Sequence, residues 1–227
     1  MNHIFMMKRT ASELDNIIVD IEFLLISVIQ GVALATLAAN AVGPISNLQI
    51  EYWLYISSAF VLILIFWSQA IIHVLSFIDW PFELTHNFLY FLTSFIEVMA
   101  FSHMTKPLIW FMFMFVFVLS SGILYLADLI FIKSRKVKFE KIPSGKVLYS
   151  NILKEQKFSL AVFVPLGLLF NLTAFFLILI FPKYFLEQKF HIFLAILQTL
   201  LGIAILIKSI RSFRQRSDLI KRYKLSS

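Results

Sequence analysis

Long apolar runs separated by short polar segments dominate the pattern of hydrophobic and polar positions along the chain. Runs of about 20 apolar residues match the hydrocarbon core of a bilayer when they form helices, which satisfy their own backbone polar groups. The alternation typical of a membrane β-barrel is missing from the sequence. The pattern predicts an all-α, polytopic membrane protein with six transmembrane helices, over residues 23–42, 53–78, 88–101, 108–132, 160–181 and 192–210.

The third run is the shortest of the six. It reaches spanning length only if its helix begins near Pro81 and places Glu83, His86 and Asn87 at the membrane interface.

Polar segments flank these runs and complete the predicted domain organisation. Residues 1–22 predict a short cytoplasmic amphipathic helix and not a cleaved signal peptide, because acidic residues follow the first basic pair and no short apolar segment with a cleavage site precedes the first run. We expect a six-helix transmembrane domain over 23–210, with a basic cytoplasmic loop at 133–157, and a basic cytoplasmic tail over 211–227. Within the loop, the Pro-Ser-Gly sequence at 143–145 predicts a turn between two basic arms.

Composition indicates that lipid solvates most of the chain. Of its 227 residues, 60% are hydrophobic and 15% are charged, and the mean hydropathy is +0.86, whereas soluble domains contain about 45–50% apolar residues. A soluble fold of this size has too little interior to bury 26 phenylalanines together with the aliphatic residues. The sequence contains no cysteine, which excludes disulfides and thiol chemistry.

The distribution of Lys and Arg predicts the orientation in the membrane. With an even number of spans, the N-terminal segment, the basic loop and the segment from Lys208 onward lie on one side, and they hold 17 of the 20 basic residues. The positive-inside rule makes that side cytoplasmic. Both termini are therefore expected in the cytoplasm.

Catalytic motifs are missing from the sequence, which has no P-loop, no HExxH, no Gly-x-Ser-x-Gly and no CxxC spacing. We therefore predict no enzymatic activity, no cofactor and no metal site. Polar residues inside the apolar runs are unfavourable in hydrocarbon, so we expect them to face the bundle interior, for helix-to-helix hydrogen bonding or for conduction and proton transfer. These intramembrane polar residues are Gln69, His73, Glu97 and Asp128. Gln69 and His73 are four residues apart and share one helix face.

The first span combines a small-residue face with a bulkier stripe. Small residues at every fourth position let membrane helices pack closely, and here they are Gly31, Ala35 and Ala39. The adjacent stripe suits a pore lining, because rings of aliphatic side chains close a pore by dewetting. The predicted pore-lining residues are Gln30, Leu34 and Leu37. The alternative is a central packing helix without a pore.

Three segments resemble the transmembrane protein 175 family: IQGVALATL from Ile29 to Leu37, Phe66-Trp67 with His73 downstream, and Asn87-Phe88-Leu89. The resemblance implies six helices per repeat and a tetrameric, potassium-permeable channel without a selectivity-filter loop. It also implies a pore that is lined by the first helix and shut by aliphatic side chains. A small channel with basic cytoplasmic elements would also suit an antiphage-defence effector of the Hailong type, in a bacterial inner membrane.

Basic side chains concentrate in the loop and the tail. They suit attraction to anionic lipid, and around an oligomer axis they would also hold a nucleotide or single-stranded nucleic acid, with Phe139, Phe213 and Tyr223 available for base stacking. The predicted polyanion-binding residues are Lys133, Arg135, Lys136, Lys138, Lys141, Arg211, Arg214, Arg216, Lys221 and Arg222.

Three functional hypotheses follow. The first is a homo-oligomeric, tetrameric channel for monovalent cations, gated by the first helix. The alternatives are a small-solute or proton-coupled membrane transporter that uses His73 and Glu97, and a non-conducting membrane scaffold. A four-fold assembly around the first helix would favour the channel, whereas a midplane cavity within one chain would favour the transporter.

Overall fold

The computed structural model of the chain describes residues 2–77 and 84–226, with side chains over 13–14, 16–76 and 84–223. The described residues form helices and no strand. In chain order, the elements are α1 (Asn2–Ser46), α2 (Ile50–Phe77), α3 (Leu84–Phe101), α4 (Pro107–Ser134), α5 (Lys136–Phe139), α6 (Pro143–Phe158), the π-helical η1 (Ser159–Phe163), α7 (Val164–Ile180), the π-helical η2 (Lys183–Glu187) and α8 (His191–Ser226).

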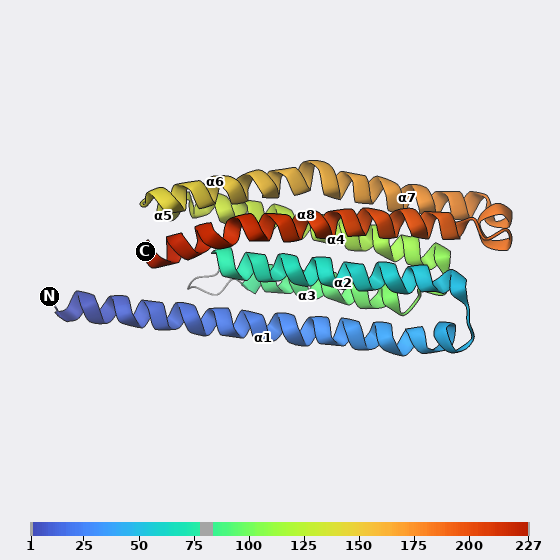
Figure 1. Cartoon of the computed structure of the whole chain (residues 1–227), viewed down its shortest axis with the longest axis horizontal. Helices are drawn as coiled ribbons and strands as arrows, with labels where there is room; N and C mark the ends of the chain where they lie inside the picture. Colours follow the sequence, from blue (N-terminus) through green and yellow to red (C-terminus); the bar gives the residue numbers. More distant parts are fainter. Residues whose placement is uncertain (1, 78–83, 227) are drawn as a thin grey trace.

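The helices form an elongated bundle in which the chain runs back and forth along one axis (Figure 1). Segments α6, η1 and α7 are continuous and make one pass. The start of α1 and the end of α8 lie at the same end, together with α5, and we call this end the basic end. Helix α2 packs against α1 and α8, α4 packs against α3 and α7, and α1 also contacts α3.

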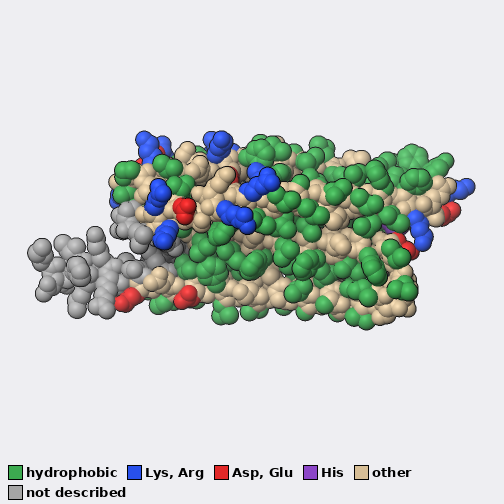
Figure 2. Space-filling model, in the orientation of Figure 1, with side chains coloured by type: hydrophobic (Ala, Val, Ile, Leu, Met, Phe, Trp, Pro, Cys, Tyr) green, Lys and Arg blue, Asp and Glu red, His purple; other side chains and the backbone are tan. Residues whose placement is uncertain are grey.

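Five helical segments of the described chain are long and apolar enough to cross a membrane: Asn16–Ser46, Ile50–Ser76, Pro107–Ser134, Pro143–Ile180 and His191–Tyr223. Hydrophobic side chains cover the long face between the two ends, and Lys and Arg gather toward the ends (Figure 2). Large apolar side chains are also exposed on α3 and α4, such as Phe88 at 69% and Ile130 at 71%. The prediction of an all-α chain with several helices of membrane-spanning length is therefore confirmed.

Helix α3 also runs along the bundle, but it is not one of those five segments. It begins at Leu84 and carries the buried polar side chains of Asn87 and Glu97, which lower its apolar character. The predicted start near Pro81, with Glu83 at the interface, lies outside the described residues.

The basic segment differs from its predicted form as a loop with a turn at 143–145. Pro143 occupies the first turn of α6, where the missing N–H of proline is not needed, so the segment is mostly helical. A second hydrophobic core forms at the basic end, from Ile132, Phe139, Leu148, Tyr149, Ile152 and Ile220. Gly145 is required there, because an added Cβ would lie 2.2 Å from the carbonyl oxygen of Phe139. Helices α5 and α6 of the predicted loop thus pack against the C-terminal part of α8.

Glycines bring the inner helices close together. An added Cβ at Gly122 of α4 would lie 2.9 Å from Val164 Cγ1 of α7, and one at Gly202 of α8 would lie 3.1 Å from Val61 Cγ1 of α2. Small residues permit such close approach between membrane helices. By contrast, an added Cβ at Gly31 of α1 would meet nothing within 4 Å.

Candidate functional site: a cavity inside the helical bundle

A cavity of about 210 Å³ lies inside the bundle, lined by α2, α4, the α6–α7 segment and α8, with His86 and Tyr90 contributed by α3. This volume far exceeds the roughly 10–15 Å³ that one buried water molecule needs. The closely packed pairs α2–α8 and α4–α7 form its walls. Much of the lining is apolar, as at Phe117 and Leu201, but polar side chains reach it at several levels along the bundle.

An amide network joins four helices at the level farthest from the basic end. Gln198 Oε1 of α8 accepts hydrogen bonds from Trp110 Nε1 of α4 at 2.8 Å and from Ser58 Oγ of α2 at 3.3 Å. Gln198 Nε2 donates to Asn171 Oδ1 of α7 at 2.8 Å. Each of these side chains belongs to a residue at most 7% exposed. A buried network with these partners fixes the relative position of the helices.

Aromatic residues lie beyond this network, toward the end opposite the basic end. Tyr55, Trp110 and Phe111 are fully buried. The rings of Tyr55 and Trp110 meet edge to face, with centroids 5.5 Å apart, and Tyr55 Oη lies 3.0 Å from His191 Nδ1. This aromatic layer fills the bundle between the cavity and that end.

The middle of the cavity carries a smaller polar pair. Gln69 Nε2 of α2 donates to Ser209 Oγ of α8 at 2.7 Å. The Lys208 ammonium lies 3.5 Å from the ring centroid of Phe158 and 4.4 Å from that of Phe163, positions at which aromatic faces attract a cation. Lys208 thus places a positive charge on the cavity lining between α8 and the α6–α7 segment.

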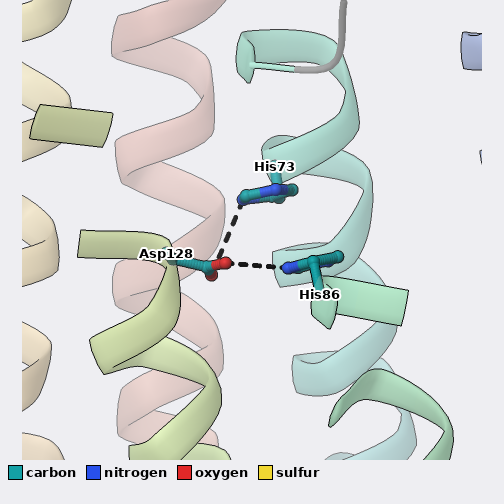
Figure 3. Close-up of side chains that lie close together, drawn as sticks. All are labelled: His73, His86 and Asp128. Atoms are coloured by element: carbon teal, nitrogen blue, oxygen red, sulfur yellow. Dashed lines mark hydrogen bonds and ion pairs between the residues drawn. The ribbon is translucent and has the colours of Figure 1, made fainter. Parts of the chain in front are cut away.

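Two histidines and one aspartate meet on the cavity lining nearer the basic end (Figure 3). His86 Nδ1 of α3 lies 2.8 Å from Asp128 Oδ1 of α4, and His73 Nδ1 of α2 lies 3.6 Å from Asp128 Oδ2. The two imidazole rings stack with centroids 4.3 Å apart and an interplanar angle of 5°. Both rings therefore present Nδ1 to the same carboxylate.

A partly buried ion pair lines the cavity closest to the basic end. Arg216 of α8 is 6% exposed, and its Nη2 lies 2.5 Å from Glu155 Oε2 of α6. Ser212 Oγ donates to Glu155 and accepts from Arg216. The Glu155 side chain is 32% exposed, so this level borders the surface of the bundle.

The four predicted intramembrane polar residues lie on inward-facing sides of their helices, and three of them line the cavity. Gln69, His73 and Asp128 are lining residues. Glu97 is fully buried on α3 and accepts a 3.4 Å hydrogen bond from Gln30 Nε2 of α1. Glu97 thus contributes to the packing of α1 against α3, away from the cavity.

The predicted pore-lining residues of α1 do not share one open face. Gln30 and Leu37 are 5% and 3% exposed and pack inside the bundle, whereas Leu34 is 46% exposed. The small-residue face of α1, with Gly31, Ala35 and Ala39, points outward. A pore lined by Gln30, Leu34 and Leu37 together would need a different rotation of α1.

The predicted polyanion-binding residues divide into an exposed set and an interior one. Arg216 is not available to a polyanion, because it is buried against Glu155. Arg135 covers the Phe131 ring at 4.1 Å. Phe139 is buried and stacks on Tyr223, so this ring does not serve as a free stacking surface. The exposed members are Lys133, Lys136, Lys138, Lys141, Arg211, Arg214, Lys221 and Arg222.

Sequence reasoning missed several residues of the cavity. Asn171 and Gln198 carried a usable signal, since each is an amide inside an apolar run. His86 was placed at the membrane interface, with no sign of its contact with Asp128.

Comparison with protein-family models, with curated proteins and with solved structures finds no match to this chain.

Proposed function

We propose that this protein is a membrane carrier for a small amphipathic solute, which binds in the cavity between α2, α4, α7 and α8. The observation that carries the proposal is a cavity within a single chain that combines an apolar lining with convergent polar groups, the usual character of small-molecule sites. The polar residues of this lining are distributed along much of the length of α8. Gln198 and Arg216 are 18 residues apart, roughly 27 Å at 1.5 Å per residue, close to the 30 Å of a hydrocarbon core.

The two ends of the cavity support a carrier more than an open pore. Near the basic end the Glu155 side chain is 32% exposed, whereas Asn171 at the other end is 4% exposed and lies next to the aromatic layer. A carrier binds its solute at a site that opens to one side of the membrane at a time. We assign this arrangement to the state that faces the basic end.

In this proposal, the chain crosses the membrane six times, with α3 as the third span, and the basic end lies in the cytoplasm. Helix α3 has 18 residues, roughly 27 Å of helix, and runs antiparallel to α4 beside it. The excess of Lys and Arg at the basic end supports a cytoplasmic orientation. The exposed basic residues there would contact anionic lipid head groups.

Accessibility of introduced cysteines tests the carrier proposal, because the natural sequence contains none. Single variants Ser209→Cys and Ser58→Cys place thiols at the middle of the cavity and at its amide network. A membrane-impermeant maleimide reacts with thiolates, which require water. We expect Ser209→Cys to react from the cytoplasmic side about tenfold faster than from the other side, because water enters from the basic end.

The control is Leu200→Cys, on the outer surface of α8 at 57% exposed, where lipid keeps the thiol unreactive. Labelling of Ser209→Cys no faster than this control, from either side, would mean a dry cavity and would reject the carrier. Equal labelling of Ser58→Cys from both sides would indicate a continuous pore instead.

An oligomeric channel is the second candidate, and one observation favours it. Gly31, Ala35 and Ala39 form an outward face on α1 that no other part of the described chain covers, and such faces mediate close helix contacts between membrane subunits. The resemblance to the transmembrane protein 175 family would place this helix at the axis of a tetramer. That assembly would use the outer face of α1, whereas the carrier uses the interior of one chain.

A further inference from the structure

We propose that His73, His86 and Asp128 form a binding site for one divalent first-row transition-metal ion, such as Zn²⁺. The inference rests on the side-chain geometry in Figure 3 and does not depend on the carrier function. It goes beyond our prediction from the sequence, in which no metal site was assigned.

The geometry of the three side chains fits a metal ion. One ligand atom from each residue lies within 4.8 Å of the others. Tetrahedral Zn²⁺ with bonds of about 2.0–2.1 Å needs ligand atoms about 3.3 Å apart, so side-chain movements of up to about 1.5 Å would complete the site. The shortest separation, 2.8 Å between His86 Nδ1 and Asp128 Oδ1, is a hydrogen-bond distance about 0.5 Å below this spacing.

The fold holds these ligands before any ion binds. The residues come from α2, α3 and α4, and His73 and Asp128 each have side chains only 10% exposed. The stacked rings keep both Nδ1 atoms on the side of the carboxylate. A site preformed in this way loses little conformational freedom when an ion binds, which favours affinity.

The ligand types select the class of metal. Imidazole nitrogen suits Zn²⁺, Fe²⁺, Ni²⁺ and Cu²⁺, whereas Mg²⁺ and Ca²⁺ prefer oxygen ligands alone. Two neutral imidazoles and one carboxylate carry a single negative charge, which partly neutralises a divalent ion inside an apolar bundle. The site therefore favours a transition metal over the abundant alkaline-earth ions.

Open coordination positions would face the cavity. All three ligand residues line it, and three protein ligands leave at least one position of a four-coordinate ion for water or a solute. An ion held here would thus contact the contents of the cavity and add a positive charge near the basic end.

The alternative is a cluster held by hydrogen bonds alone, with imidazole N–H groups donating to the carboxylate of Asp128. Both arrangements use the same atoms, so the distances by themselves fit either one. Metal binding separates them.

The experiment titrates Co²⁺ into the purified full-length chain in detergent, prepared with an affinity tag that contains no histidine. We expect one Co²⁺ per chain with visible absorption bands of a nitrogen and oxygen site, displaced by Zn²⁺ and unaffected by excess Mg²⁺. Asp128→Asn should weaken binding at least tenfold. The matched control is His103→Gln, since His103 follows the end of α3, lies outside the cavity lining and contacts Met99 O at 2.8 Å.

Absence of Co²⁺ binding by the wild type, or equal binding by a folded Asp128→Asn variant, would overturn the site and leave the hydrogen-bonded cluster. If Asp128→Asn does not elute as a folded protein, His86→Gln replaces it and must lose binding in the same way. As a further readout, Zn²⁺ should raise the unfolding temperature of the wild type, and a chelator should reverse the shift. A wild type whose stability Zn²⁺ does not change would also contradict the proposal.

Discussion

The same residue types occupy outward-facing positions of the bundle, as on the outer face of α1, and inward-facing positions around the cavity. Gly31 on α1 points outward, with open space around it, whereas Gly122 on α4 lies against Val164 of α7. Arg214 on α8 is exposed, whereas Arg216, two residues later, is buried against Glu155. Residue type therefore does not tell which side of this bundle a position faces.

The cause of this ambiguity is the solvent. In a soluble protein, the polar outer face of a helix marks its inner face by contrast. Lipid is as apolar as the core, so a membrane helix is hydrophobic all round and its rotation leaves little trace in the sequence. Among the described residues, Leu200 at 57% and Leu194 at 8% exposed illustrate this on α8. Predictions that depend on rotation need structure.

The largest difference between the two faces is expected at the two arginines. Arg216→Ala should lower stability by about 2–3 kcal/mol, because loss of a buried partner leaves the Glu155 charge unpaired at a partly buried position. Arg214→Ala should change it by less than about 0.5 kcal/mol, as is usual for surface substitutions. Unfolding by heat or denaturant in detergent measures both. Equal effects would mean that the Glu155–Arg216 pair is not formed.

This contrast also changes how nucleic-acid binding is tested. A double substitution that includes Arg216 would confound binding with folding. Arg211 and Arg214 are both exposed, and their joint replacement by Ala removes surface charge alone. Salt-sensitive oligonucleotide binding that this pair abolishes would support a polyanion site, whereas unchanged binding would place any such site elsewhere.

The glycines provide the second contrast. Gly122→Leu should lower stability by about 2 kcal/mol, because the new side chain overpacks the contact between α4 and α7. Gly31→Leu is the matched control and should leave the stability of the single chain unchanged, since its Cβ meets nothing. The thermal unfolding temperatures of the two variants, each compared with that of the wild type, measure the two stability changes. A Gly31→Leu loss as large as that of Gly122→Leu would show that α1 packs on its outer face.

A third and smaller effect is expected at the amide network. Gln198→Leu should lower stability by about 1 kcal/mol, because Trp110 Nε1 loses its acceptor in a buried place and interhelical hydrogen bonds in membranes contribute about this much. Gln215→Leu on the exposed end of α8 is the control. The tryptophan fluorescence spectrum gives an independent readout. No stability loss relative to the control would mean that Gln198 is not the acceptor.

Much of the fold was predictable because apolar runs of spanning length are a strong signal. Runs at 53–78 and 108–132 correspond closely to α2 and α4. The weak third run corresponds to α3, where Asn87 and Glu97 interrupt the apolar pattern. The basic loop was predicted less well, since the helix-starting role of Pro143 competes with a turn at the same position.

The site was predictable only in part. Gln69, His73 and Asp128 could be identified because a polar side chain in hydrocarbon must face inward. Their partners could not, because Ser209 and His86 are distant in sequence and meet them only through the relative rotation of different helices. The same limit explains the pore-lining prediction, which selected Leu37 from spacing although the structure packs it inside.

The smallest effect is expected on the outer face of α1. Ala35 is exposed, so Ala35→Leu should change the stability of the single chain by less than about 0.5 kcal/mol. Its effect on assembly is the sharper measurement, because a small-residue face that joins subunits does not accommodate leucine. Light scattering coupled to size-exclusion chromatography compares the particle mass with that of Ala204→Leu, another exposed alanine on α8. We expect both variants to keep the wild-type mass if the cavity of each chain is the functional unit. A smaller particle for Ala35→Leu alone would identify the α1 face as a subunit contact and would favour the channel over the carrier.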